Sequence, residues 1–121
     1  MKEYVYDTLI KGISATDLDF AYIQFEVYGY EKGDPIDLGD ITTDILMFMD
    51  SVNDAEQNVK QLRIDLEENA ELLAELKEYE DDLKYHLRMV EILSKMYNNA
   101  MISDGSANTA QNFIDENWKR E

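Results

Sequence analysis

Apolar residues recur at alternating three- and four-residue spacing from Leu38 to Tyr97, and this repeat constrains the fold more than any other feature of the chain. Such spacing places them on one face of an α-helix that packs against another helix. One position of the repeat holds Leu38, Ile45, Val52, Val59, Leu66 and Leu73. The position three residues further on holds Ile41, Phe48, Ala55, Leu62, Asn69 and Leu76. Glu80 interrupts the series, which then resumes with Leu83, Leu87, Val90 and Tyr97. We call this apolar face the seam and predict helix over 38–99.

The distribution of apolar residues around the helix indicates that it folds back on itself. Residues 45–49 and 87–96 are apolar on all sides, whereas residues 56–83 are apolar mainly on the seam. Two extremities buried on every side need a common partner, and an antiparallel hairpin brings them together. We therefore predict a bend near 68–71. It would pair Leu66 with Leu73, Leu62 with Leu76, Val52 with Leu87 and Phe48 with Val90.

A continuous helix is the alternative to the hairpin. Residues 68–71 hold neither Gly nor Pro, and three of the four favour helix. In that case two chains would dimerise along the seam, and Asn69 would be the polar residue that fixes their register. In the hairpin, Asn69 lies at the bend instead.

The segment 1–37 differs in texture, being rich in Tyr and Gly. Apolar and polar residues alternate from Phe20 to Tyr30, which predicts a strand with one buried face, paired with a strand at 4–10. A helix over 14–25 is the alternative, because Ser14 and Asp17 resemble a capping pair. Asp37 or Asp40 would cap the long helix.

The expected fold is therefore α+β and predominantly helical, in a single domain of residues 1–121. A small β-rich, hairpin-like segment (1–37) precedes the helical hairpin (38–99). A short amphipathic helix (107–119) follows, whose Phe113, Ile114 and Trp118 would fold back onto the apolar end of the hairpin.

Charge restricts the partners of this chain. It has 27 acidic and 11 basic residues, a net charge of −16, which repels nucleic acids and anionic membranes and favours a basic partner. There are no cysteines, which removes disulfides and thiol chemistry. The N-terminus lacks the apolar core of a signal peptide, and the longest apolar run, 45–49, is too short for a membrane span. We expect a soluble, cytoplasmic protein.

No motif for catalysis, metals or cofactors survives inspection. His86 is the only histidine, so a di-iron bundle or a multi-histidine zinc site is excluded, and we expect His86 to be a helix-surface or interface residue. The glycines lack phosphate-binding spacing. Asp34, Asp37, Asp40 and Asp44 miss the spacing of a calcium loop, and capping explains them better. The expectation is a protein without enzymatic activity, metal or cofactor.

The remaining feature is a run of carboxylates in the middle of the helical region. The predicted partner-binding residues are Glu67, Glu71, Glu75, Glu78 and Asp82, on the face opposite the seam, with Glu68, Glu80 and Asp81 beside them. A solvated outer face would also be charged, but such faces mix signs, because like charges four residues apart destabilise a helix. The run therefore has two interpretations that both stay open: a solvated outer face, which is the usual role of charged outer positions, and a surface that binds a basic partner.

In size, acidity and helix-plus-strand texture, the chain resembles the small acidic inhibitors that phages encode against nucleic-acid-handling defence enzymes, the anti-CRISPR and DNA-mimic type. These proteins share no common motif, so the resemblance assigns no residue. It implies direct inhibition of a basic, nucleic-acid-binding enzyme such as a nuclease, in whose groove rows of carboxylates stand in for phosphates. The alternative is a coiled-coil structural or adaptor protein that forms a homodimer.

Overall fold

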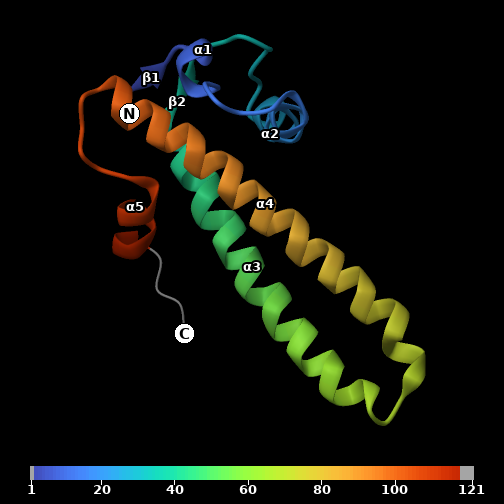
Figure 1. Ribbon diagram of the computed structural model, residues 1–121. Helices are drawn as coiled ribbons and strands as arrows, with labels where there is room; N and C mark the ends of the chain where they lie inside the picture. Colours follow the sequence, from blue (N-terminus) through green and yellow to red (C-terminus); the bar gives the residue numbers. More distant parts are fainter. Residues whose placement is uncertain (1, 118–121) are drawn as a thin grey trace.

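The computed structural model describes residues 2–117, and its dominant feature is a helical hairpin. Helix α3 (Leu38–Leu66) and helix α4 (Leu73–Ser103) run antiparallel, joined by a short 3₁₀ helix, η1 (Ala70–Leu72) (Figure 1). The predicted hairpin is confirmed, and the continuous helix is wrong.

Asn69 makes the bend without help from Gly or Pro. Its backbone is extended (φ −143°, ψ 97°), and its side-chain oxygen accepts a hydrogen bond from the backbone N–H of Glu71, 3.1 Å from N to O. A short amide side chain that caps the next turn is a standard way to start a helix. The polar residue in the seam thus lies at the bend, as the hairpin predicts.

The seam holds its predicted register in α3, whereas in α4 one of its two repeat positions moves by one residue and the other is kept. In α3, Ile41, Ile45, Phe48, Val52, Ala55, Val59 and Leu62 are all buried. In α4, Leu76 is buried as predicted, but Leu73 is 62% exposed and Leu87 is 48% exposed. The predicted pairing of these two leucines with Leu66 and Val52 is therefore wrong. The extended residue at the bend interrupts the helical phase, so the seam of α4 restarts at Leu72 and continues through Leu76, Tyr79, Leu83, His86, Val90, Leu93 and Tyr97.

The predicted strand at 20–30 is wrong, because these residues belong to helix α2 (Ala15–Val27), the alternative interpretation. The Ser14 side chain accepts a hydrogen bond from the backbone N–H of Asp17 (3.2 Å), so the proposed capping pair exists. Residues 4–10 are mostly helix α1 (Tyr6–Leu9). The β-structure of the segment is smaller than predicted: β1 (Glu3–Tyr4) pairs antiparallel with β2 (Ile36–Asp37), Tyr4 opposite Ile36.

Asp37 begins the long helix, as one of the two predicted caps. Its side chain accepts a hydrogen bond from the backbone N–H of Gly39 (2.7 Å). The other candidate, Asp40, accepts one from the Tyr30 hydroxyl (2.6 Å) instead.

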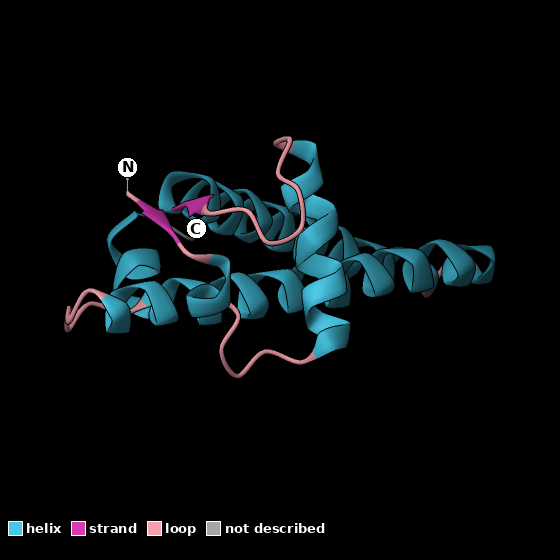
Figure 2. Cartoon of the chain, turned by 90° about the horizontal axis from the view of Figure 1, so that it is seen from above, coloured by secondary structure: helices cyan, strands magenta, loops and turns pink. Residues whose placement is uncertain are grey.

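The N- and C-terminal segments gather around the open end of the hairpin, which we call the base. Helix α2 runs across the hairpin, seen end-on in Figure 1 and lengthwise in Figure 2, and α5 (Ala110–Asn117) lies on the opposite side. The predicted C-terminal helix is confirmed over 110–117, with Ile114 buried; Trp118 and residue 119 lie outside the described residues. Asn98 accepts a hydrogen bond from the backbone N–H of Ala110 (2.8 Å) and holds α5 against α4.

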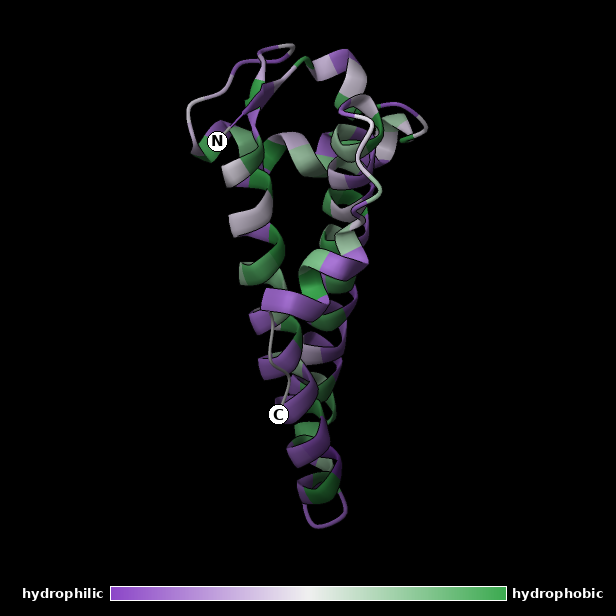
Figure 3. Cartoon of the chain, turned by 90° about the vertical axis from the view of Figure 1, so that its left-hand side faces the viewer, coloured by the Kyte–Doolittle hydropathy of each residue, from purple (hydrophilic) through white to green (hydrophobic). Residues whose placement is uncertain are grey.

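Apolar burial is concentrated at the base. One core cluster joins α1, α2, β2, α5 and the adjoining halves of α3 and α4, while a smaller cluster of Val59, Leu62 and Leu76 lies near the bend. In Figure 3, green apolar and purple hydrophilic stretches alternate along both helices, and the loop at the far end of the hairpin is hydrophilic. The hairpin is thus a narrow projection rooted in the base.

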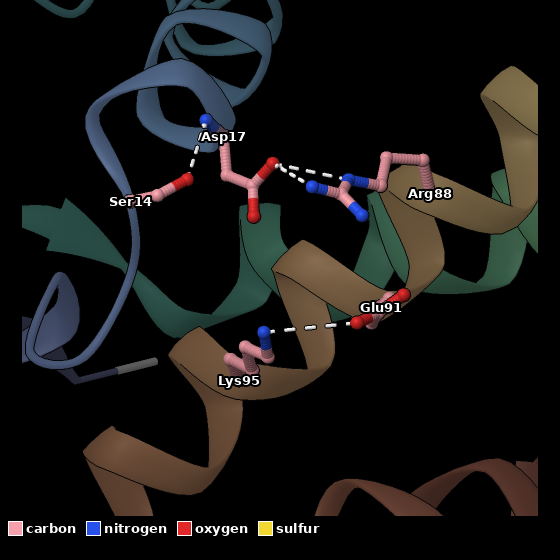
Figure 4. Close-up of polar contacts among 5 residues, drawn as sticks. All are labelled: Ser14, Asp17, Arg88, Glu91 and Lys95. Atoms are coloured by element: carbon pink, nitrogen blue, oxygen red, sulfur yellow. Dashed lines mark hydrogen bonds and ion pairs between the residues drawn. The ribbon is translucent and has the colours of Figure 1, made fainter.

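An ion pair fastens α2 across α4. The buried carboxylate of Asp17 accepts two hydrogen bonds from Arg88, from Nη2 at 2.5 Å and from Nε at 3.0 Å (Figure 4). We expect Arg88→Ala to lower the free energy of unfolding by about 1–2 kcal/mol, less than for a fully buried pair because the Arg88 side chain is half exposed. Urea denaturation followed by circular dichroism measures this loss.

A second ion pair of α4, also drawn in Figure 4, provides the control for Arg88→Ala. Lys95 pairs with Glu91 on the exposed surface of the same helix, 3.6 Å apart. Lys95→Ala should change stability by less than about 0.5 kcal/mol. Equal losses in the two variants would contradict a fastening role for Arg88.

Candidate functional site

The eight predicted partner-binding residues lie on the outer part of the hairpin, residues 51–87, which we call the arm. Glu67 and Glu68 follow the end of α3, and Glu71 is in η1. The other five, Glu75, Glu78, Glu80, Asp81 and Asp82, are in α4. All are exposed except Glu80, which is half-buried. The middle of the predicted acidic run is therefore open to solvent.

These carboxylates do not form one surface. At about 100° per residue, Glu80 and Asp82 point to opposite sides of α4. Glu80 lies 3.5 Å from Arg63 of α3 in an ion pair. Asp82 lines a groove on the other side, together with Asp54 of α3. The arm thus has two sides of different chemistry.

We call the first side the acidic flank. Glu75 lies seven residues before Asp82, two turns away on the same side of α4, and Glu78 lies between them. On α3, Asp54 is joined by Asp65, eleven residues or three turns further on. The acidic flank therefore consists of Asp54, Asp65, Glu75, Glu78 and Asp82. The two α3 residues were missed in the sequence, although their eleven-residue spacing was a signal that they share one side.

We call the second side the mixed flank. Glu56, Lys60, Arg63 and Ile64 of α3 line its groove together with Leu83 of α4. Glu80 belongs here through Arg63, and Leu73 and Leu87 lie seven residues before and after Glu80 on the same side. Lys77 and Lys84 follow Leu73 and Glu80 by one turn. All four cations of the arm, Lys60, Arg63, Lys77 and Lys84, thus lie on or beside the mixed flank.

The ion pairs between these acids and the chain's own cations follow the same division into two flanks. Among the described residues, Glu80 is the only one of the eight predicted carboxylates that lies within 4.0 Å of a Lys or Arg nitrogen. At the bend, Glu67 and Glu68 also stand at the carboxyl end of α3, where the helix dipole disfavours negative charge, whereas Glu71 and Glu75 stand at the favourable amino end of α4. The repulsion among these acids is therefore relieved only in part within the chain.

The groove on the acidic flank combines carboxylates with aromatic rings. It has a volume of about 210 Å³ and lies between α3 and α4; its lining includes Ser51, Asp54, Asn58, Tyr79, Asp82 and His86. The centre of the His86 ring lies 5.7 Å from that of the Phe48 ring, and its Nδ1 is buried without a hydrogen-bond partner among residues 2–117. Carboxylates beside ring faces are what the guanidinium of an arginine prefers.

The aspartates that were considered for a calcium site in the sequence make structural hydrogen bonds instead. Asp34, Asp37, Asp40 and Asp44 each accept a hydrogen bond, from a backbone N–H or a tyrosine hydroxyl. Within residues 2–117, no group of three His, Asp or Glu side chains lies close enough to hold a metal ion. None of the helices in that range is long and apolar enough to cross a bilayer.

No protein-family model, curated protein or solved structure matches this chain. What the arm binds must therefore be inferred from its own chemistry.

Proposed function

We propose that this protein is a non-enzymatic binding protein that inhibits a basic, nucleic-acid-binding partner, such as a nuclease, by placing its acidic flank in the partner's groove. The observation that carries the proposal is the separation of charge on the arm. The acids of one side lack ion pairs among the described residues, while the cations lie on the other side. A surface that serves solubility alone intersperses both signs, so solubility does not account for this division.

The spacing of the carboxylates suits a mimic of nucleic acid. Glu75, Glu78 and Asp82 span eight residues of α4, a rise of roughly 10 Å at 1.5 Å per residue step. One strand of DNA places about three phosphates in the same length. Three carboxylates over that distance present a similar linear charge density to a groove built for phosphates.

The shape of the arm suits insertion into a groove. It is two helices wide and projects from the base, where the apolar residues of both helices are buried (Figures 1 and 3). The net charge of −16 would also attract a basic partner at long range and speed association. A rooted arm can enter the partner while the base stays outside.

A charge-reversal experiment tests this proposal. The partner is first captured from host lysate in low salt and released in high salt, which selects contacts between opposite charges. We expect the triple variant Glu75→Lys/Glu78→Lys/Asp82→Lys to bind the captured protein about tenfold or more weakly, because charged contacts at an interface set both attraction and register. Nucleic acid should compete with the wild-type protein for the same site.

The control carries the same change of net charge at the base. Glu3, Glu26 and Glu116 are exposed and lie in β1, α2 and α5, away from the arm. Their triple reversal to lysine should weaken binding only about two- to threefold, through the long-range field. If both triple variants lose affinity equally, net charge alone drives binding and the acidic flank has no specific role.

A further inference from the structure

We propose that the mixed flank is a self-association surface, through which two copies of this chain pack their arms side by side. The first observation is a group of exposed aliphatic side chains. Leu73 is 62% exposed, Ile64 56% and Leu87 48%, all on this side of the arm. Single exposed apolar residues are common on proteins, but several of them beside an apolar groove mark a contact surface.

The groove itself gives these side chains a place to pack. It has a volume of about 460 Å³, and Val59, Ile64 and Leu83 supply its apolar lining between the charged residues Lys60 and Arg63. Helix α5 covers this side of the hairpin only at the base, where Phe113 packs 5.4 Å from Tyr97. The outer part of the flank remains uncovered by the described chain.

The charges on the mixed flank indicate that the partner bound there is a second copy of this chain. At a net charge of −16, two copies repel each other through most of their surfaces. The mixed flank carries Lys60, Arg63 and Lys84 beside Glu56 and Glu80, so it presents both signs. A surface with both signs can meet the same surface of a second copy about a two-fold axis, which brings cations such as Lys60 and Lys84 near the acids of the other copy.

The helical repeat supports the same arrangement. Leu73, Glu80 and Leu87 occupy a repeat position that the seam of α4 does not use. They form a second row next to the seam, so the apolar face of α4 is wider than contact with α3 requires. Each helix of a four-helix bundle packs against two neighbours and needs such a wider face. Two hairpins joined in this way leave both acidic flanks pointing outward.

Sedimentation equilibrium of the full chain over a range of concentrations tests the inference. We expect the average mass to rise with concentration towards twice the chain mass. The double variant Leu73→Ser/Leu87→Ser should raise the dissociation constant at least about tenfold, because it removes two apolar contacts from each copy. Both residues are exposed, so the variant should keep its helicity by circular dichroism. Val27 and Ile102 are even more exposed (78% and 74%) but lie off the arm, and Val27→Ser/Ile102→Ser should leave the constant unchanged.

The dependence of the dissociation constant on salt concentration is a second test of self-association. Added NaCl should strengthen self-association, because it screens the repulsion between two anionic chains, whereas it should weaken binding of a basic partner. A monomeric mass up to about 1 mM protein in high salt, a range that detects even millimolar dissociation constants, would overturn the inference. So would equal dissociation of the Val27/Ile102 control. Neither result bears on the acidic flank, whose residues take no part in this contact.

Discussion

Replacing Leu93 by alanine is expected to lower the free energy of unfolding by about 2–5 kcal/mol, the range for a leucine removed from a packed core. Leu93 is fully buried in the main cluster, where α4 meets α3 at the base. The matched variant is Leu87→Ala, in the same helix. Leu87 is half exposed, so we expect a change within about 0.5 kcal/mol. Urea denaturation in dilute solution, where self-association does not contribute, measures both.

The comparison tests the rotation of α4 about its own axis. Both variants replace leucine by alanine inside the same helix, so any change in helix propensity is shared and small. Only burial distinguishes them. If Leu87→Ala were as destabilising as Leu93→Ala, Leu87 would lie in the seam, as the continuous repeat predicts, and the acidic and mixed flanks would be assigned to the wrong sides of the arm.

The rotation of α4 could not be predicted from the repeat because the repeat counts residues as if the helix were unbroken. Asn69 is extended, and η1 is wound more tightly than an α-helix, so the phase is lost between Leu66 and Leu76. Leu72 and Leu73 are both leucine and differ little in sequence terms. The hairpin and the buried face of α3 were predictable, since each depends on one uninterrupted helix.

The N-terminal segment shows a different limit. Residues four apart share a side in a strand, whose period is two, and nearly share one in a helix, whose period is 3.6. Ala21 and Phe25 are buried and fit both periods, whereas Ile23 and Val27, which a strand would bury beside them, are exposed. The cap at Ser14 was the better guide, because it acts on the backbone of the first turn and needs no knowledge of distant contacts.

The exposure of the predicted carboxylates could be predicted from the position of the seam in the sequence. Their division between the acidic and the mixed flank could not. Each flank takes residues from both helices, Asp54 and Asp82 on one side, Arg63 and Glu80 on the other. Such pairs become visible only when the rotation of each helix is known. The prediction from α4 alone therefore included Glu80, which lies on the mixed flank, and left out Asp54, which lies on the acidic flank.

Loss of the Tyr28 hydroxyl is expected to destabilise the base by about 2–3 kcal/mol at neutral pH, the range for a hydrogen bond to a buried charged group. Asp44 is 1% exposed, and its Oδ1 accepts a hydrogen bond from Tyr28, 2.5 Å from oxygen to oxygen. Its Oδ2 is buried without a hydrogen-bond partner among the described residues. In Tyr28→Phe, the carboxyl would lose the one hydrogen bond described for it.

This loss should depend on pH with a definite sign. Burial, and to a lesser degree the neighbouring Asp40, raises the pKa of Asp44 above its ordinary value of 3.8, while the Tyr28 hydroxyl lowers it. A carboxyl whose pKa is higher in the folded than in the unfolded state destabilises the fold once ionised; stability is regained as the pH falls through the folded pKa towards 3.8. Tyr28→Phe raises the folded pKa further, because it removes the bond to the charged form. The destabilisation should therefore shrink as the pH falls.

Unfolding by urea at neutral pH and just above pH 3.8, the lower end of the window in which the folded and unfolded carboxyls differ in protonation, measures the dependence. The control places Tyr28→Phe in an Asp44→Asn background, where no proton can bind at this position and the effect of the hydroxyl should be independent of pH. If Tyr28→Phe is equally destabilising at both pH values in the wild-type background, Asp44 does not change charge between them, and the predicted dependence on pH is wrong. A loss that shrinks with acid only when Asp44 is present would assign the effect to this buried carboxyl, rather than to the many exposed acids that also gain protons.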